Sequence, residues 1–467
     1  MPRGRHAALA AVALLGIGAG AAVPALDGGT PAAAQSPGIT HGPTAFVQRI
    51  LADIKPARIE QYDRMLASFG TRHTLSSQDD PNRGVGAARD WIFDQFQQSA
   101  AASGGRMTVE KQSFVQPPAD RVPEPTTITN VVATLKGTQA ESAGRTYVIS
   151  GHYDSRCSDP LDAVCDAPGA NDDASGVSAV LELARVMATR RFDATIVFMA
   201  VAGEEQGLYG STHFAELAKA NGVDIRGMFT NDIIGSSTGD KGQKDPFTVR
   251  VFSEGIPTTE TDEQAELRRS IGGENDGVSR QLARYIKEVG ENSATHMKVR
   301  LIWRRDRYLR GGDQIPFLEQ GFPAVRFTEP NEDFRHQHQD VRVEDGVQFG
   351  DLPKFVDFRY IARVARVDGA ALANLALAPT APKEATIDTT QLTNDTTLRW
   401  AANPEPDVAG YEVVWRESTD ALWTHAIDVG NVTEFTLPLS KDNIQVGVRA
   451  VDRGGYRSPV SFPLPSP

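Results

Sequence analysis

A β-rich run, Thr146-Tyr147-Val148-Ile149-Ser150, leads directly into Gly151-His152-Tyr153-Asp154. Apolar and β-branched residues in this run predict a buried strand, and the two polar side chains come where the strand ends. Because His152 and Asp154 are two positions apart on an extended chain, both point to the same face. The stretch therefore predicts a sheet strand that delivers an imidazole and a carboxylate to one site.

Helical patterns alternate with short β-rich runs on both sides of this strand. Apolar residues at helical spacing mark 44–102, and further helices are expected at 176–189 and 278–289. Further strands are expected at 128–135, 195–200, 228–234, 248–252, 299–303 and 324–328. This alternation predicts an α/β domain with a mostly parallel, buried central sheet flanked by helices.

Acidic residues follow two more of these strands. Glu204 and Glu205 come after the strand at 195–200, and Asp232 comes at the end of the run 228–231. Ligands bind at the carboxyl ends of strands in such sheets. Two adjacent carboxylates repel each other unless a cation or a proton compensates, so the pattern favours a metal site over a solvated acidic turn.

The segment from Gly169 to Gly176 adds a further carboxylate at a helix start. Asp172 could bridge two cations with its two oxygens, or it could cap the helix. Asp173 and Ser175 are equally good capping residues, which would leave Asp172 free. Two cations that share Asp172 would each need one more carboxylate and one imidazole, and zinc accepts both ligand types.

The late histidines supply the missing imidazole. His336 and His338 lie in Phe334-Arg335-His336-Gln337-His338-Gln339-Asp340, after the strand at 324–328. A lone histidine in a polar loop is usually a surface residue. Two in one loop after a strand end indicate a ligand.

The ordered motifs HxD, GANDDASG, GEE, ND and HxxxD resemble those of the secreted di-zinc aminopeptidases of metallopeptidase family 28, over residues 44–377. The resemblance implies a zinc exopeptidase fold, two zinc ions, and a metal-bridging hydroxide that releases amino-terminal residues from peptides with a free N-terminus. It implies the metal ligands His152, Asp172, Glu205, Asp232 and His336. Glu204 would be the general base, and Asp154 would fix the tautomer of His152. His336 is preferred to His338 because Asp340 stands four residues after it.

The chain departs from the family pattern in two places. Arg335 stands where a tyrosine often precedes the last histidine, so Tyr308, Arg310 or Arg335 could stabilise the tetrahedral intermediate instead. Asp313 lies in a segment where the family more often has a histidine after the aspartate. It is a weaker candidate that would lie behind the ligands.

The amino-terminal residues 1–34 combine arginines, an apolar alanine-rich run and a small-residue end, which predicts a secretory signal peptide and a secreted or periplasmic protein. No later segment is expected to span a membrane. In an oxidising compartment Cys157 and Cys165 are expected to form a disulfide. The net charge of -12 argues against nucleic acid as a partner.

The carboxyl-terminal residues differ in character from the peptidase-like part at 35–378. After a linker at 379–386, short alternating runs at 387–467 predict an antiparallel β-sandwich. Trp400, Tyr411 and the run 450–455 resemble the fibronectin type III pattern. The sandwich is a candidate for attachment to a surface or polymer.

Three other functions stay open at this point. A carboxypeptidase or a glutaminyl cyclase could use the same scaffold, and the cyclase resemblance implies a single zinc. A catalytically dead binding protein is the third reading. Retention of His152 and Asp172 favours two metals, and unused buried carboxylates would be costly to keep.

Overall fold

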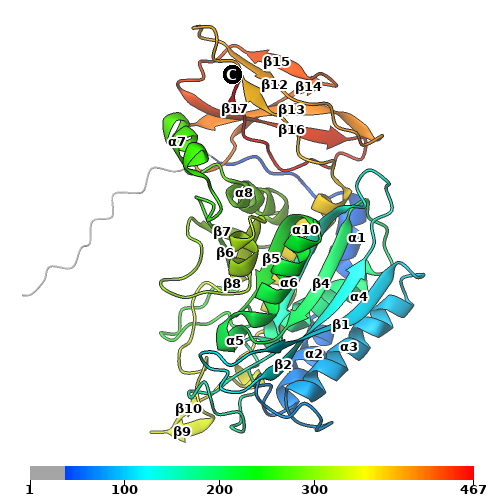
Figure 1. The fold of residues 1–467 in the computed structure, drawn as a ribbon, viewed down its shortest axis with the longest axis vertical. Coiled ribbons are helices and arrows are strands. Elements are labelled where there is room, and N and C mark those ends of the chain that lie inside the picture. The colour runs from blue at the N-terminus through cyan, green and yellow to red at the C-terminus, as the bar shows by residue number, and fades with distance from the viewer. Residues whose placement is uncertain (1–36, 467) are drawn as a thin grey trace, which may run out of the picture. The chain divides into compact units, whose positions relative to one another are not determined.

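The strand that carries His152 lies inside an eight-stranded sheet with the order β1-β2-β4-β3-β5-β8-β6-β7 in the computed structural model, which describes residues 37–466 (Figure 1). The strands are β1 Met107–Gln116, β2 Thr126–Leu135, β3 Arg145–His152, β4 Thr195–Val201, β5 Asp224–Asn231, β6 Thr248–Ser253, β7 Lys298–Ile302 and β8 Ala324–Thr328. The neighbours β4, β3, β5 and β8 are parallel. The predicted signal peptide, residues 1–34, lies outside the described residues.

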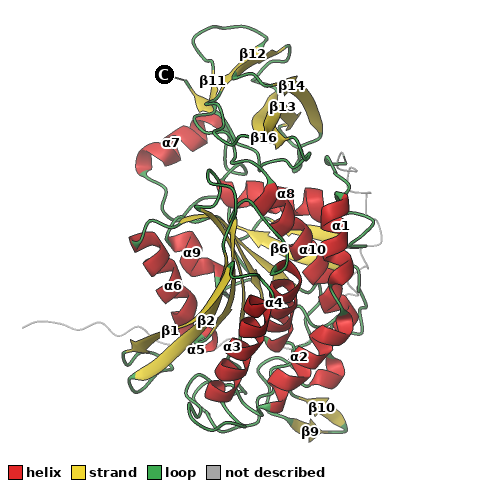
Figure 2. Cartoon of the chain, turned by 90° about the vertical axis from the view of Figure 1, so that its right-hand side faces the viewer, coloured by secondary structure: helices red, strands yellow, loops and turns green. Residues whose placement is uncertain are grey.

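Helices cover both faces of this sheet (Figure 2). One face carries α1 Ala45–Asp53, α2 Pro56–Ser68, α3 Val85–Ala101, α4 Ala174–Met187, α8 Val278–Gly290 and α10 Phe358–Leu377, and the other carries α6 Tyr209–Ala220 and α9 Gln314–Glu319. Along β3, Tyr147 and Ile149 pack into the hydrophobic core between the sheet and the larger group of helices. Val148 packs into the core between the sheet and the helices α6 and α9. Both faces of the strand are therefore buried, and the predicted α/β fold with a mostly parallel sheet is confirmed.

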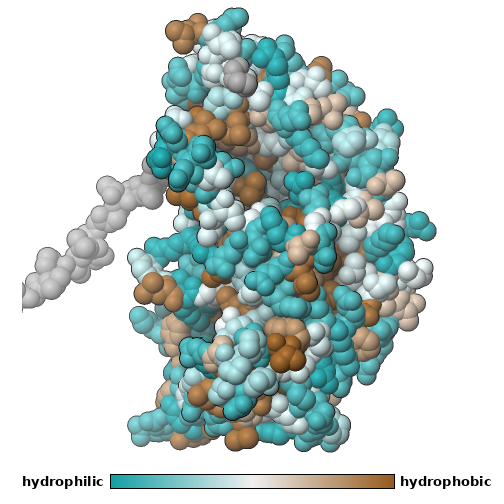
Figure 3. Space-filling view, in the orientation of Figure 1, coloured by the Kyte–Doolittle hydropathy of each residue, from teal (hydrophilic) through white to brown (hydrophobic). Residues whose placement is uncertain are grey.

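Shorter elements complete this part of the chain. They are α5 Glu204–Gly207, α7 Asp262–Ile271, β9 Arg342–Glu344, β10 Val347–Phe349 and the 3-10 helix Pro353–Phe355. Within residues 37–466, no helix is both long and apolar enough to cross a membrane. On the face drawn in Figure 3, hydrophobic residues gather in separate patches among hydrophilic ones.

Two small sheets follow α10, in the region predicted as a sandwich. Their strand orders are β15-β12-β11-β17 and β14-β13-β16. The strands are β11 Thr386–Ile387, β12 Thr396–Arg399, β13 Val408–Glu417, β14 His425–Gly430, β15 Glu434–Leu437, β16 Ile444–Asp452 and β17 Leu464–Pro465. Trp400 and Tyr411 pack in the core between them, 5.4 Å apart at their ring centres. The fibronectin type III assignment and the exact domain boundaries stay predictions.

The small sheets contact the segment that contains α8 through buried polar pairs, which we call the α8 interface. Arg416 Nη2 lies 2.7 Å from Asp276 Oδ2, and Arg449 Nη1 lies 2.7 Å from Glu288 Oε1. Trp423 Nε1 donates to Gln281 Oε1 at 3.0 Å. The described residues 37–466 accordingly lie within one compact unit.

Candidate metal centre

Three parallel strands bring their carboxyl ends to one edge of the sheet. His152 is the last residue of β3, Glu204 and Glu205 begin α5 shortly after β4, and Asp232 follows β5 directly. Since β3 pairs in parallel with both β4 and β5, these four side chains meet at the same place. The polar groups therefore converge at the carboxyl ends of the strands, where the sequence predicts the site.

Six side chains form two groups that could each hold a metal ion. The first group is His152, Glu204 and Asp232, and the second is Asp172, Glu205 and His338. In the first, His152 Nε2 lies 3.9 Å from Asp232 Oδ1 and 4.0 Å from Glu204 Oε2. In the second, His338 Nε2 lies 2.9 Å from Asp172 Oδ2 and 3.0 Å from Glu205 Oε1.

Asp172 connects the two groups. Its Oδ2 contacts His338, and its Oδ1 lies 3.0 Å from His152 Nε2. Helix capping does not occupy it, because Asp173 is the N-cap of α4 and accepts from the Gly176 N–H at 2.9 Å. Asp173 also accepts from the His152 N–H at 3.0 Å, so one carboxylate fixes both the helix start and the strand end.

The structure places His338, not His336, in the site, which corrects the choice made from the sequence. The His336 ring stacks on Phe355 at 3.8 Å between ring centres, lines a neighbouring pocket and belongs to neither group. Asp340 does not support a ligand histidine either, because it accepts from Ser158 Oγ at 2.6 Å. His338 has a left-handed backbone (φ 54°), and the local turn sends its side chain toward Asp172.

Asp154 lies behind His152, as expected. The His152 Nδ1 is 3.1 Å from the Asp154 carbonyl oxygen and 3.6 Å from its Oδ1, so the closer partner is the backbone oxygen. The buried Asp154 carboxylate accepts from Thr74 Oγ1 at 3.0 Å and from the N–H groups of Glu204 and Glu205 at 3.3 and 3.2 Å. The carboxylate therefore fixes the start of α5, and the backbone oxygen of the same residue orients the histidine.

Two arginines that the sequence reasoning did not identify hold the carboxylates that do not bridge. Arg326 on β8, fully buried, places Nη1 2.6 Å from Asp232 Oδ2. Arg156 places Nε 2.9 Å from Glu205 Oε2. A side chain at Gly312 would collide with Arg326, since its Cβ would lie 2.3 Å from Nη1. Glycine at this position is what lets the guanidinium reach Asp232.

Asp351 is a further residue that the sequence reasoning did not identify. Its Oδ1 accepts from the Asn171 N–H at 2.9 Å, and its Oδ2 accepts from the Asp172 N–H at 2.7 Å. It thereby holds the loop that presents the bridging carboxylate. Asp313 is buried nearby, where burial raises its pKa to about 7, but it belongs to neither group.

Negative charge is concentrated in the site. Burial, opposed by His152 and reinforced by Asp232 and Glu205, raises the pKa of Glu204 well above its usual range. Burial lowers the pKa of His338, but Glu205 and Asp172 outweigh it and raise that pKa to about 10. The buried Glu205 Oε1 lies 3.0 Å from His338 Nε2 but accepts no hydrogen bond of regular geometry from the described residues. An unsatisfied buried oxygen among crowded carboxylates fits a site made for cations, and this donor set suits zinc.

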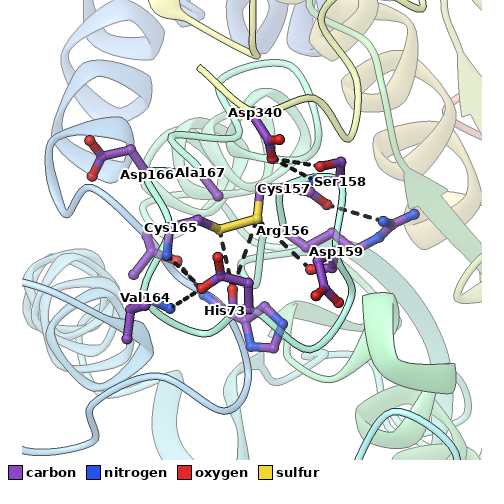
Figure 4. Close-up of a disulfide and its surroundings, with 12 residues drawn as sticks. His73, Arg156, Cys157, Ser158, Asp159, Val164, Cys165, Asp166, Ala167 and Asp340 are labelled. Carbon is purple, nitrogen blue, oxygen red and sulfur yellow. Dashed lines mark hydrogen bonds between the residues drawn. A yellow bond between two sulfur atoms is a disulfide. The ribbon is translucent and has the colours of Figure 1, made fainter. Parts of the chain in front are cut away.

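The predicted disulfide between Cys157 and Cys165 is confirmed (Figure 4). It closes the loop that follows β3 and that carries Arg156. Ser158 of the same loop bonds Asp340, which ties the loop to the segment that holds His338 (Figure 4). The disulfide therefore braces the surroundings of the second group and does not supply a ligand to it.

A cleft of about 330 Å³ opens over both groups. Its acidic lining consists of Asp172, Glu204, Glu205 and Asp232, and its arginines are Arg121, Arg156, Arg307 and Arg310. Of the three side chains considered for stabilising an intermediate, only Arg310 lines this cleft. Arg335 lines a neighbouring pocket with His336, and Tyr308 is 76% exposed.

A family model and the sequences of related proteins both match this chain to metallopeptidases. Residues 130–344 match the model of Peptidase family M28. A protein from Pyricularia oryzae described as "Probable zinc metalloprotease" is 55% identical over 429 residues, which cover 91% of this chain and 85% of that protein. A protein from Leptosphaeria maculans described as "Probable zinc metalloprotease" is 52% identical, covering 91% of this chain and 99% of its own length.

Among solved structures, a glutaminyl cyclase from Macrostomum lignano superposes with a TM-score of 0.50. The match covers 73% of this chain and 97% of that one, at 15% sequence identity. At that identity the likeness shows a shared fold and nothing about the reaction.

Proposed function

Since this chain belongs to peptidase family M28 and is a zinc metallopeptidase, we propose that it removes amino-terminal residues from peptides with the help of two zinc ions. The observation that carries the proposal is the position of Asp172, whose two oxygens contact one histidine of each group. A single-metal site would not need a second imidazole at the same carboxylate. An exopeptidase also needs only a small cleft, because it holds one end of the substrate.

The proposed ligand sets follow the two groups. His152 and Asp232 would hold one ion, Glu205 and His338 the other, and Asp172 would contribute to both. Zinc bound there would lower the pKa of a water molecule and polarise the scissile carbonyl. Arg326 and Arg156 each bond one oxygen of a ligand carboxylate, so they orient Asp232 and Glu205.

Glu204 is the proposed general base. Its side chain lines the cleft and is 13% exposed, so it can reach both water and substrate. It takes the proton of the attacking water and gives it to the leaving amine as the C–N bond breaks. Burial raises its affinity for a proton, which suits a group that must both accept and return one.

Substitution of this base tests the mechanism. Glu204→Gln should lower kcat by about 10²- to 10⁴-fold, the usual contribution of a general base, while zinc content and melting temperature stay unchanged. Glu216→Gln, which alters an exposed carboxylate on α6, is the matched control. A Glu204→Gln enzyme that keeps near wild-type turnover would show that another group takes the proton.

Substrate panels and chelation test the activity itself. Amino-acid p-nitroanilides with a free amine should be cleaved, and their N-acetyl forms should not. Chelation should abolish cleavage, and zinc should restore it, with two ions bound per chain. One tightly bound zinc and no cleavage would favour the glutaminyl cyclase alternative, and cleavage from the carboxyl terminus would favour a carboxypeptidase.

The proposal includes export. Residues 1–34 are interpreted as a signal peptide, and the Cys157–Cys165 disulfide is consistent with an oxidising compartment. N-terminal sequencing of the mature protein from its producing cells should find a start close to residue 35. A mature protein that begins at Met1 inside the cell would contradict this part of the proposal.

A further inference from the structure

The cleft over the two groups has an excess of arginine that the proposed metal chemistry does not use. We propose that these arginines bind a substrate carboxylate next to the scissile bond, so that the enzyme prefers substrates with an anionic group there. The inference rests on the proposed function, whose substrate class it narrows.

The first step is the charge balance of the lining. Every carboxylate that lines the cleft belongs to one of the two groups and would face a cation when metal is bound. Four arginines line the same cleft. Arg156 is paired with Glu205, and Arg307 is paired with Asp306 behind the lining. Among the described lining residues, no further carboxylate remains to bind the ammonium of a substrate side chain or to neutralise the other two, Arg121 and Arg310.

Arg310 is the arginine best placed to bind a ligand. Its side chain is 31% exposed, and its Nη1 lies 2.7 Å from Glu332 Oε2. Glu332 also pairs with Arg250 at 2.9 Å and with Arg307 at 3.4 Å. One carboxylate thus serves three guanidinium groups, of which Arg307 has a closer partner in Asp306, at 3.0 Å. Arg310 bonds it through Nη1, and its Nε and Nη2 have no partner within residues 37–466.

Arg121 adds a second guanidinium to the lining. Its Nη1 donates to the Glu205 carbonyl oxygen at 3.0 Å, which anchors the side chain beside the second group. This carbonyl oxygen is the side chain's one acceptor within residues 37–466, where it forms no ion pair with a carboxylate. Arg121 and Arg310 therefore both keep donors available in a cleft that already holds the reacting groups.

The chemistry of these donors identifies the ligand. A guanidinium presents parallel N–H groups that match a planar carboxylate, and such charge-assisted pairs are stronger than neutral hydrogen bonds. Two sources of carboxylate fit equally: the side chain of an acidic amino-terminal residue, or the free carboxyl terminus of a short peptide.

The experiment compares substrates that differ only in that carboxylate. We would measure kcat/KM for Glu- and Gln-p-nitroanilide, and for the dipeptide Leu-Gly and its amide. Preference for Glu assigns the side chain, and preference for Leu-Gly over its amide assigns the terminus. Either preference should reach about 10- to 100-fold, the contribution of a charge-assisted hydrogen bond.

Arginine variants then test the residues. Arg310→Gln and Arg121→Gln should each reduce the preference toward one through a higher KM for the anionic substrate. Arg335→Gln removes a guanidinium that pairs with Asp333 outside the cleft, and it should keep the preference. If Arg310→Gln lowers kcat equally for all four substrates, Arg310 acts on the reacting carbonyl and the inference is wrong.

A binding measurement separates this inference from the proposed function. Calorimetry with zinc-loaded Glu204→Gln protein should show L-glutamate or Leu-Gly binding more tightly than L-glutamine or Leu-Gly amide, and Arg310→Gln should remove the difference. Cleavage with no preference in either pair would overturn the inference and leave the aminopeptidase proposal intact. Selective binding with no cleavage of any peptide by the unsubstituted enzyme would support the inference and contradict the aminopeptidase proposal.

Discussion

The α8 interface and the metal cleft are both built from arginines and carboxylates, but their charges are matched in opposite ways. At the interface, the fully buried Arg449 lies 2.7 Å from Glu288 and 2.7 Å from Glu412. In the cleft, the carboxylate of Asp172 contacts the histidines of both groups, His152 and His338. Arg310 shares Glu332 with two other arginines, and Arg121 pairs with no acid of the described residues. The same residue types are therefore paired with each other at the α8 interface, whereas in the cleft some of them have no partner of opposite charge within the described residues.

This difference separates polar residues that stabilise the fold from polar residues that are available to bind a ligand. Buried ion pairs recover their desolvation cost only when the partners satisfy each other, so a matched set has nothing left for a ligand. A set that remains unmatched inside the protein needs an outside partner, here cations for the carboxylates and an anion for the arginines. Changing each region separately tests this interpretation.

The largest effect is expected at the interface. Arg449→Met removes the cation that Glu288 and Glu412 share, and it leaves them with His41 and Arg457 as their remaining partners. Because these partners remain, the free energy of unfolding should fall by about 3 kcal/mol, the lower end of the range for breaking a buried pair. Arg399→Met is the control, because Arg399 pairs with Asp388 and Glu434 on the surface, where water screens the pairs, so its loss should change the free energy of unfolding little. Urea unfolding monitored by fluorescence measures both. Equal effects would mean that the interface pairs are no more important than surface pairs.

In the cleft, the ligand histidine should affect metal more than stability. His338→Ala removes a ligand of the second group, and it should weaken binding of one zinc ion by more than about 100-fold, since even residues behind a ligand cost 10- to 100-fold. His336→Ala, two residues away, should keep both ions because its ring stacks on Phe355. Zinc titration with a chromophoric chelator measures the loss. Loss of zinc in the His336 variant alone would restore the ligand choice made from the sequence.

The smallest effect concerns an unmatched carboxylate beside the small sheets. Burial, together with Asp407 and Asp452, raises the pKa of Asp193 from 3.8 to about 6. The native state therefore binds more protons than the unfolded state between these values, so this residue lowers stability as pH rises from about 4 to about 6. Asp193→Asn should raise the melting temperature above pH 6 and leave it unchanged below pH 4.

Asp388 provides the opposite sign for the same measurement. Its hydrogen bonds to Thr390 and Arg399 lower its pKa to about 2, so its contribution to stability is present above about pH 4 and lost as pH falls toward 2. Asp388→Asn should lower the melting temperature slightly at neutral pH. A rise in both variants would show that net charge, not the local environment, controls the response.

The sequence predicted the fold and most of the site because both depend on local patterns. Apolar runs such as Tyr147 to Ile149 predict a strand buried on both faces, and polar residues at strand ends mark His152, Glu205 and Asp232. The histidine choice failed because it depends on a contact at a distance. Phe355 holds the His336 ring, and no local spacing signals that partner.

The arginines were missed for a related reason. Arg326 lies in the middle of β8, where an arginine in a sequence usually indicates an exposed position, yet it is fully buried against Asp232. Its glycine neighbour across the site, Gly312, was the one available signal. The pairing of Arg416 and Arg449 with the α8 segment joins residues more than 100 positions apart, and a single sequence cannot show it.

The α8 interface has a consequence for how such a chain can be divided. A protein cut after residue 378 would lose Arg416, Trp423 and Arg449, which contact the α8 segment across the interface. It would uncover the polar groups of that segment together with a partly apolar helix. The small sheets would carry Arg449 and Trp423 uncovered in the same way. Gene fusion or recombination could therefore transfer the two parts together as one inherited module far more readily than either part alone.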